Sequence, residues 1–588
     1  MMEWDLTPLY PSFQSEEFQG DLKKLEEKIE DLLKWTEKEL SSTDNAAEKV
    51  AEFLRRYIDI EELFDLLGHY AFLTMSVEAD NEDAALYADK IQMIGSRLTP
   101  AMVRFERFLA SLGSLDEVLT TDIAKEHEYW LRKRLEHARR LLSEKEEGLI
   151  AQMKTTGGYA WSRLRGTVTA KLTGTIEIDG EKKELSINAL RNMAYDKDPD
   201  VRKKAYEAEL AAYPKVEDTV ASAMNSIKGE YLIIIKKRGY NDPLESTLEY
   251  MHLDRDTFET VMEVIRENLP AFRKYLRHKA KLLGYEGGLP WYDLFAPIGK
   301  FDKTYTIEEA KEFILSVFKQ FDEELYALAK RAFEERWIDY TPRRGKRGGA
   351  FCAKVHPLKQ SRIMANFDGS FDGITTLAHE LGHAFHNYNQ RKESILNATS
   401  PMPIAETASI FNEVLVIEKT LPTVDKDAKV FILEKDLSGN TQVIVDIMSR
   451  FIFESEVFRR RAEGVLSVPQ LKEIMLQAQK EAYGEGLDEN YLHPYMWVIK
   501  PHYYSPDLHF YNFPYAFGLL FSRGLYAMYK KEGDDFIPKY KELLRNTGKY
   551  DVGDIGSIIG IDLREKDFWQ ASMDGLKQEI EEFIALTS

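Results

Sequence analysis

Cysteine and long apolar runs are the two features that this chain of 588 residues most clearly lacks. Cys352 is the only cysteine, so no disulfide can form within the chain, and its apolar surroundings favour a packed thiol over a metal ligand. No segment approaches the roughly 18 consecutive apolar residues that a membrane helix needs. The first residues also lack the basic and apolar regions of a signal peptide. We therefore expect a cytoplasmic protein that does not bind membranes.

Positive charge is also in deficit, because the formal net charge is −20. Such an acidic chain repels nucleic acid, which excludes it as the main partner. Helical periodicity covers most of the chain and strands are few, so we expect a mainly α fold with a small β-sheet. A turn at Asp196–Asp200 indicates a loose boundary. It would separate a helical region over residues 1–190, with a β-hairpin at Thr173–Leu185, from a region over 191–588.

The most informative pattern is H-E-x-x-H at His379–His383, inside an apolar run with helical spacing. Residues i and i+4 of a helix share one face, so the His379 and His383 imidazoles can bind one zinc ion. Glu380 projects beside that ion, where it can take a proton from a water molecule. Gly382 costs about 1 kcal/mol relative to alanine inside a helix. Its presence indicates that another element packs closely there.

A catalytic zinc site usually has three protein ligands and one open position. The extended pattern H-E-x-x-H-x-x-G-x-x-H is excluded, because His386 and Asn389 occupy its glycine and last histidine positions. We therefore expect a carboxylate from the next helix, Pro403–Val416, and choose Glu406 in its first turns. Glu413 lies on the same face and can accept a hydrogen bond from a ligand imidazole, although an ordinary surface role stays open. His386 is either such a supporting residue or a core histidine.

A basic, glycine-rich loop precedes this helix at Arg343–Gly349 and leads into an apolar run, Ala350–Val355. That run can pair with Ser361–Phe367 as a hairpin. An edge strand beside the metal helix would offer backbone N–H and C=O groups to an extended peptide. The predicted peptide contacts are Gly349, Ala350 and Phe351. A flexible surface loop is the alternative.

Five segments together resemble one known family. They are F-D-G-I-T-T-L-A-H-E-L-G-H-A-F-H (371–386), P-I-A-E-T-A-S-I-F-N-E (403–413), W-D-L-T-P-L-Y-P-S-F (4–13), R-G-G-A-F-C (347–352) and P-H-Y-Y-S-P-D-L-H-F-Y-N-F-P-Y-A-F-G (501–518). The chain is similar throughout to the thimet oligopeptidase superfamily of zinc metallopeptidases, and most closely to its oligoendopeptidase F branch. The resemblance implies a large helical body enclosing a deep channel, with residues 191–588 as the catalytic domain. It also implies one zinc ion per chain and cleavage of internal bonds in short peptides.

The resemblance assigns roles to the C-terminal segment as well. The family has a histidine followed by two tyrosines about a helical turn apart, and His502, Tyr511 and Tyr515 match that order. Tyr515 would stabilise the oxyanion that forms during peptide hydrolysis, helped by Tyr511 and His502. The stretch Ser505–His509 is longer than in the family, so His509 is a rival for the histidine role and otherwise a predicted peptide contact. Each of these aromatic residues could instead belong to a helix core.

Two other interpretations stay open at this point. Glu380 and His383 also form an E-x-x-H pair, and a second pair exists at Glu249 and His252, as in di-iron helix bundles. A peptide-binding protein without catalysis is the other alternative, although the intact base Glu380 argues against it. One zinc ion or two iron ions per chain would separate the first alternative from the peptidase. Cobalt or manganese in place of zinc is not excluded.

Overall fold

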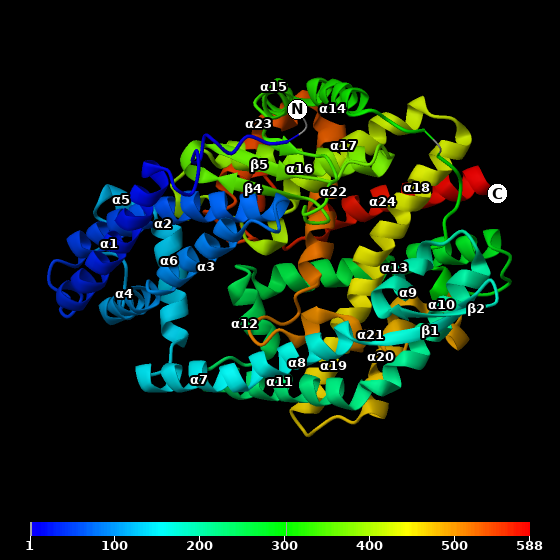
Figure 1. The fold of residues 1–588 in the computed structure, drawn as a ribbon, viewed down its shortest axis with the longest axis horizontal. Coiled ribbons are helices and arrows are strands. Elements are labelled where there is room, and N and C mark those ends of the chain that lie inside the picture. The colour runs from blue at the N-terminus through cyan, green and yellow to red at the C-terminus, as the bar shows by residue number, and fades with distance from the viewer. Residues whose placement is uncertain (1–2, 302) are drawn as a thin grey trace.

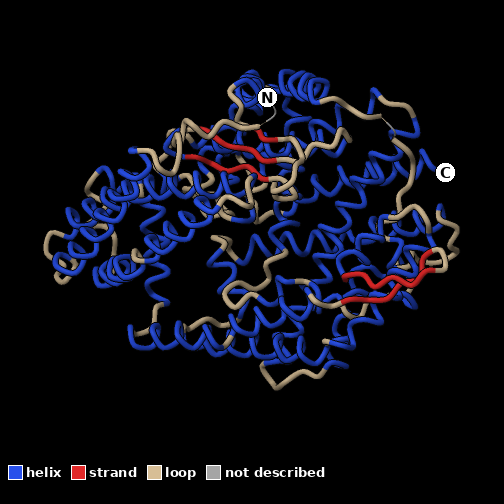
Figure 2. Tube along the Cα trace, in the orientation of Figure 1, coloured by secondary structure: helices blue, strands red, loops and turns tan. Residues whose placement is uncertain are grey.

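Helices make up most of the protein, and the strands form only two small sheets (Figures 1 and 2). The computed structural model describes residues 3–301 and 303–588. The predicted mainly α class is confirmed. No helix in these described ranges has the length and apolar character needed to cross a membrane.

The first helices pack around an N-terminal core. They are α1 (Glu16–Glu39), α2 (Ala46–Val77), α3 (Glu82–Ser96), α4 (Thr99–Leu112), α5 (Asp122–Glu126) and α6 (Glu128–Arg140). Ser15 caps α1 by accepting a hydrogen bond from the Phe18 amide at 3.2 Å, as expected for a serine before a helix. Buried Phe18, Phe53 and Phe105 belong to this core, which extends to Val355 in the sheet. The N-terminal helices are thereby attached to the strands that precede the H-E-x-x-H helix.

A second core lies around the predicted hairpin. The elements of this part are α7 (Glu144–Thr156), α8 (Gly158–Ala170), β1 (Thr173–Ile178), β2 (Glu181–Ser186), α9 (Ile187–Asn192), α10 (Pro199–Ala212), α11 (Glu217–Lys237) and α12 (Pro243–Tyr250). The two strands pair antiparallel across a turn in which Asp179 and Gly180 both have positive φ, so the hairpin prediction is confirmed. Ile176 shares its core with Trp497 and Tyr503, far along the chain. The division near residue 190 stays a prediction.

The second sheet lies just ahead of the H-E-x-x-H helix in sequence. The elements leading to it are α13 (Arg255–Leu282), α14 (Ile307–Phe321), α15 (Glu323–Glu334), β3 (Ile338–Asp339), β4 (Phe351–Val355) and β5 (Gln360–Met364). Its strand order is β3-β5-β4, with β4 and β5 antiparallel and β3 parallel to β5. The predicted pairing of the two runs is therefore confirmed. β4 lies at the edge of the sheet.

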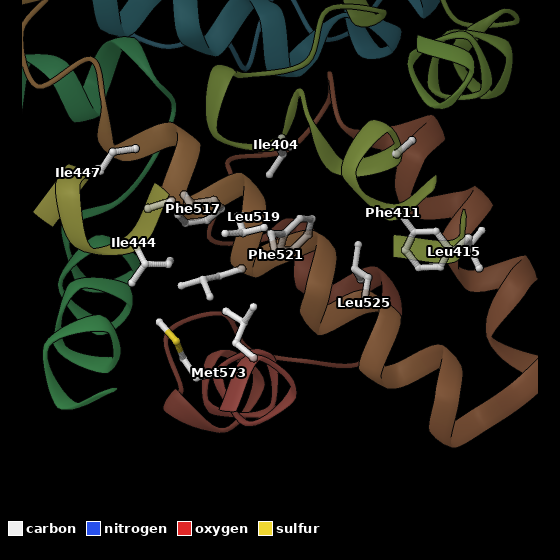
Figure 3. Close-up of a cluster of buried hydrophobic side chains, with 14 of the residues drawn as sticks. Ile404, Phe411, Leu415, Ile444, Ile447, Phe517, Leu519, Phe521, Leu525 and Met573 are labelled. Atoms are coloured by element: carbon white, nitrogen blue, oxygen red, sulfur yellow. The ribbon is translucent and has the colours of Figure 1, made fainter. Parts of the chain in front are cut away.

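The remaining helices build the largest core. They are α16 (Phe371–Gln390), α17 (Thr407–Thr420), α18 (Lys426–Thr441), α19 (Ile447–Arg461), α20 (Val468–Tyr483), α21 (Met496–Ile499), α22 (Phe513–Glu532), α23 (Phe536–Asn546) and α24 (Lys566–Thr587). Figure 3 shows Phe411 and Leu415 of α17, Phe517 and Phe521 of α22 and Met573 of α24 in one apolar cluster. This packing holds α17 and α22, which carry several predicted site residues, in a fixed relation.

Candidate metal centre and active site

The H-E-x-x-H residues lie in the middle of α16, as predicted. Ser370 starts this helix by accepting a hydrogen bond from the Gly373 amide at 3.1 Å. His379 and His383 then stand one turn apart on the same face, with ring centroids 4.9 Å from each other. Glu380 projects to a different side and is only 5% exposed.

Gly382 allows the next helix to pack directly against α16. A Cβ atom at Gly382 would lie 2.3 Å from the Ala408 carbonyl oxygen and 2.6 Å from the Ser409 Cα, closer than such atoms approach in proteins. Asn412 reinforces the contact by donating a hydrogen bond to the Ala378 carbonyl at 3.3 Å. The close packing that the glycine predicted is therefore present, and the element concerned is the start of α17.

Glu406 reaches the two histidines from the cap position of α17. The prediction that it lies within the first turns of a helix starting at Pro403 is wrong, because α17 begins at Thr407. Residues 402–404 form a 3-10 turn instead, in which the carbonyl oxygens of Pro401 and Met402 bind amides three residues on. α22 holds the residues just after this turn, since the Ser522 hydroxyl lies within hydrogen-bond distance of the carbonyl oxygens of Glu406, at 3.3 Å, and Thr407, at 3.0 Å.

The three side chains offer a set of donor atoms that fits one metal ion. Glu406 Oε2 lies 3.3 Å from His379 Nε2 and 3.2 Å from His383 Nε2. Ligands at about 2.0–2.1 Å from a tetrahedral zinc ion are separated by roughly 3.3–3.4 Å, so these spacings match the edges of such a site. Of the described residues, only these three form a histidine, cysteine or carboxylate group with that spacing.

The electrostatics of the donor set also favour a cation. Burial lowers the pKa of His379, but hydrogen bonds to Glu406 and Glu413 outweigh it and raise that pKa to about 10. Burial raises the pKa of Glu406, but both histidines hold it well below its ordinary value. The proton on His379 here stands in for a positive charge between the three donors. Two imidazoles and a carboxylate are also ligands that zinc commonly takes.

Glu413 contacts the other ring nitrogen of His379, as expected. The His379 Nδ1–H donates to Glu413 Oε1, which leaves Nε2 free to face the metal position. His386 has a different role: it is buried and its Nε2 lies 2.8 Å from the Thr547 hydroxyl. Of the two roles considered for His386, the structure therefore supports that of a core histidine.

Glu380 carries a buried oxygen with nothing to bind. Its Oε2 has no hydrogen-bond partner among the described residues. Burial, the largest effect, raises the pKa of this carboxyl above its ordinary value. A buried acceptor without a partner is costly, so such an atom in a native structure calls for an explanation. A raised pKa and a free oxygen are the properties that a proton acceptor near neutral pH requires.

The edge strand β4 lies beside this carboxylate. Burial and then the nearby Glu380 raise the pKa of the Cys352 thiol, which therefore stays protonated and packed as expected. Gly349 has a φ of +80° and its carbonyl accepts a hydrogen bond from the Asn366 side chain at 2.9 Å. Phe351 packs against Phe72 of the N-terminal core, with ring centroids 5.1 Å apart. The predicted peptide contacts at Gly349, Ala350 and Phe351 stay predictions.

The basic loop before β4 is held in place rather than free. The side chain of Lys346 is fully buried, and its amine binds Asp339 Oδ1 at 2.6 Å and the Ala365 carbonyl at 2.6 Å. Arg343 binds both oxygens of the same aspartate, at 2.7 and 2.8 Å. The backbone amide of Arg347 donates to the Ser76 carbonyl at 2.8 Å. These contacts argue against the flexible-loop interpretation.

The predicted histidine and tyrosine residues form a chain of ring contacts. His502 stacks on Tyr511 with centroids 4.8 Å apart and planes 8° apart, and Tyr511 lies 6.0 Å from Tyr515. Burial, followed by Tyr511, raises the pKa of Tyr515 to about 12, so its hydroxyl stays protonated at neutral pH. Tyr515 lines the same cavity as His379 and Glu406.

His509 lies apart from this chain of rings. It is fully buried, its Nδ1 accepts from Lys228 Nζ at 2.9 Å, and its ring contacts Tyr231 and Phe458. Lys228 in turn pairs with Glu454, whose other oxygen accepts from the Phe510 amide at 3.1 Å. This burial speaks against the predicted peptide contact of His509 and favours His502 as the histidine of the segment.

The second E-x-x-H pair is not assembled as a metal site. Glu249 accepts hydrogen bonds from Tyr240 at 2.8 Å and Arg140 at 3.1 Å. His252 lies beyond the end of α12, and its Nδ1 is 2.7 Å from the Tyr129 hydroxyl. Both side chains already have protein partners, which argues against a di-iron centre.

The structure has one cavity beside the metal centre and another beside the N-terminal core. One of about 430 Å³ opens beside His379, Glu406 and Tyr515. Another of about 740 Å³ is lined by Phe72 and Trp130 from the N-terminal helices and by His252 and Met402. A single deep channel that joins such spaces stays a prediction. Sequence patterns did not point to the residues of α18 that line the first cavity, although the glycine inside that helix, Gly439, was a visible signal.

Comparison with known proteins places the chain in a family. The model of Peptidase family M3 matches residues 192–575, and that of Oligopeptidase F matches residues 111–173. Oligopeptidase PepF of Bacillus subtilis is 24% identical, with 99% of this chain and 87% of that protein covered. An oligoendopeptidase F homolog of Borreliella burgdorferi is 26% identical, with 99% and 97% covered.

Solved structures agree on the fold. A peptidase candidate from Chlamydophila abortus superposes with a TM-score of 0.86 at 21% identity, over 99% of this chain and 98% of the other. Oligoendopeptidase-F from Enterococcus faecium superposes with a TM-score of 0.72 at 21% identity, over 97% and 98%. The chain therefore belongs to peptidase family M3, in its oligoendopeptidase F branch. It is a peptidase, as the sequence predicted.

Proposed function

We propose that this peptidase is a zinc-dependent endopeptidase that hydrolyses internal bonds of short peptides. The observation that carries the proposal is the spacing of 3.2–3.3 Å between the Glu406 oxygen and the two histidine nitrogens. That spacing suits one zinc ion, and the site between the three side chains lies near the carboxylate of Glu380. The names of the relatives, oligopeptidases and oligoendopeptidases, support peptide substrates of limited length. A cytoplasmic location stays a prediction.

The proposed roles follow from the contacts of each residue. A zinc ion bound by His379, His383 and Glu406 would supply a Lewis acid that acidifies water and polarises a peptide carbonyl. Glu380 accepts the proton of the attacking water through its free oxygen and returns it to the leaving amine. No covalent intermediate with the protein is needed.

Two further residues support this chemistry. Glu413 keeps the proton of His379 on Nδ1, so that Nε2 presents a lone pair to the metal. Tyr515 keeps its proton at neutral pH and lines the cavity beside His379, so it can donate a hydrogen bond to the oxyanion. Tyr511 and His502 support Tyr515 through their stacked rings.

The test is cleavage of a quenched fluorescent decapeptide that is blocked at both ends. Blocked ends exclude exopeptidase activity, so cleavage reports on internal bonds alone. We expect a chelator to abolish cleavage and added zinc to restore it, with one zinc ion per chain by metal analysis. His383→Ala is expected to lose the zinc, whereas His252→Ala, the matched control in the other pair, is expected to keep it. No cleavage by zinc-loaded protein would refute the proposal.

A further inference from the structure

The cavity beside the metal centre has the size of a ligand pocket and is lined by helices. The cavity of about 430 Å³ is in the usual size range of ligand pockets, about 300–1,000 Å³. Four helices line it: α16, α17, α18 and α22. Figure 1 shows where these helices lie in the fold. The residues from α16 and α22 include His379 and Tyr515, so the cavity begins at the reaction site itself.

The face from α18 follows helical spacing and includes a glycine, which has no side chain, near its C-terminal end. Its members are Phe431, Ile432, Lys435, Asp436, Gly439 and Asn440. Gly439 is in the helix interior, where glycine is destabilising by about 1 kcal/mol relative to alanine. A Cβ atom at this position would meet nothing within 4 Å. No close neighbour therefore explains this glycine, unlike Gly382. Gly439 is exposed and lines the cavity, so a side chain at this position would extend into open space there.

The rest of the lining favours an apolar occupant. Apolar side chains come from all four helices, among them Phe371, Ile410, Phe431 and Leu519. The charged side chains pair with one another: Arg523 binds Asp436 at 2.6 Å, and Lys435 binds Asp372. Paired charges offer little to a charged ligand, which would have to be desolvated on entry.

The residues of α22 connect the cavity to the proposed site of peptide cleavage. Tyr515, Leu519 and Arg523 lie four residues apart on one face of α22, so they lead from the oxyanion donor into the cavity. A peptide held between the metal ligands and Tyr515 would therefore lie at the entrance of this cavity, within reach of its wall for the side chains next to the scissile bond.

We propose that this cavity is a specificity pocket for a bulky apolar side chain adjacent to the scissile bond, and that Gly439 keeps it open. The proposal rests on the endopeptidase function proposed above and narrows its substrate class. A pocket of this kind discriminates between side chains by the apolar area that they bury. We expect roughly 10–100-fold between a large apolar residue and alanine, as found for apolar pockets in other enzymes.

The experiment uses zinc-loaded protein and peptides that differ only at the two positions flanking one bond, with alanine, leucine, phenylalanine, lysine or glutamate at each. The wild-type chain is expected to prefer leucine or phenylalanine at one of them in kcat/KM. Gly439→Leu fills the cavity, so kcat/KM for those peptides is expected to fall at least tenfold, while the alanine peptide is cut at a similar rate. The control is Gly148→Leu, at an exposed glycine of α7 with equally open space.

Several results would overturn the pocket. A wild-type preference for lysine or glutamate at both positions would do so, as would an equal loss on all peptides with Gly439→Leu. If that variant does not fold by circular dichroism, Gly439→Ala removes part of the same volume and is expected to lower the preference several-fold. An unchanged preference with Gly439→Ala would then count against the proposal.

Failure of the endopeptidase function is distinguishable from failure of the pocket. Absence of zinc-dependent cleavage by both the wild type and Gly148→Leu would refute the function. The pocket is then decided by calorimetric binding of the phenylalanine and alanine peptides to wild-type protein and Gly439→Leu. Tighter binding of the phenylalanine peptide that Gly439→Leu abolishes supports the pocket, and equal binding overturns it.

Discussion

The chain carries the same Glu-x-x-His spacing in two places, and only one of them forms a site. Glu380 and His383 lie in the middle of α16, where the helix continues for seven residues beyond the histidine. Glu249 lies near the end of α12, which stops at Tyr250, and His252 has a positive φ of 53°. The second pair therefore lacks the continuous helix that would place both side chains on one face.

The partners of the two pairs differ as clearly as their backbones. In the second pair, Tyr129 binds the His252 ring, and Glu249 accepts from two donors. In the first pair, Glu380 Oε2 has no partner among the described residues, and His383 Nε2 faces Glu406 at 3.2 Å. A short motif is thus informative only together with the packing around it, which decides whether donor atoms stay available for a metal or a substrate.

The largest contrast is expected from removing each glutamate charge. Glu380→Gln is expected to lower kcat by roughly 10²–10⁴-fold, since the amide cannot accept the proton of water. Its zinc content stays at the wild-type level, because Glu380 is not one of the three donors. Glu249→Gln is the matched variant and is expected to keep kcat within about twofold. Near-normal turnover of Glu380→Gln would remove its assignment as the base.

The tyrosines beside the two pairs give the next contrast. If Tyr515 is the proposed oxyanion donor, Tyr515→Phe is expected to lower kcat by roughly 10²–10³-fold. Tyr515 is 41% exposed, so the free energy of unfolding of this variant is expected to differ little from that of the wild type. Tyr129→Phe removes the 2.7 Å contact with His252 and is expected to lower the free energy of unfolding by about 1–2 kcal/mol without lowering kcat. Turnover and urea unfolding of both variants check this, and an unchanged kcat for Tyr515→Phe would contradict it.

Much of the metal centre follows from sequence because its rules are local. Helical spacing places His379 and His383 together, and Gly382 signals the close approach of α17. The exact onset of α17 could not be predicted, since Glu406 follows a 3-10 turn and its carbonyl oxygen accepts a hydrogen bond from Ser522 of α22. That contact joins residues more than one hundred positions apart.

Other features depend on contacts that no local pattern encodes. His509 looked like a site residue because of its place among tyrosines, but it is buried and its polar partners are Lys228 on α11 and Glu454 on α19. Their separation along the chain hides the pairing. The cavity beside the metal centre likewise forms only when four helices come together. The position of Gly439 in its lining therefore could not be predicted from the sequence around it.

The smallest effect is expected from the residue behind the metal ligand. Glu413→Gln keeps an oxygen near His379 Nδ1 but removes the negative charge, which raises the basicity of the imidazole as a metal ligand. Zinc affinity, measured by competition with a chelator, is expected to fall about tenfold, the lower end of the roughly 10–100-fold seen for such partners. Glu418→Gln on the same helix is the control, since Glu418 pairs with Lys530 at 3.4 Å instead of a metal ligand. Equal affinities of the two variants would mean that Glu413 only orients the ring, and the contrast between the two pairs would then rest on geometry rather than charge.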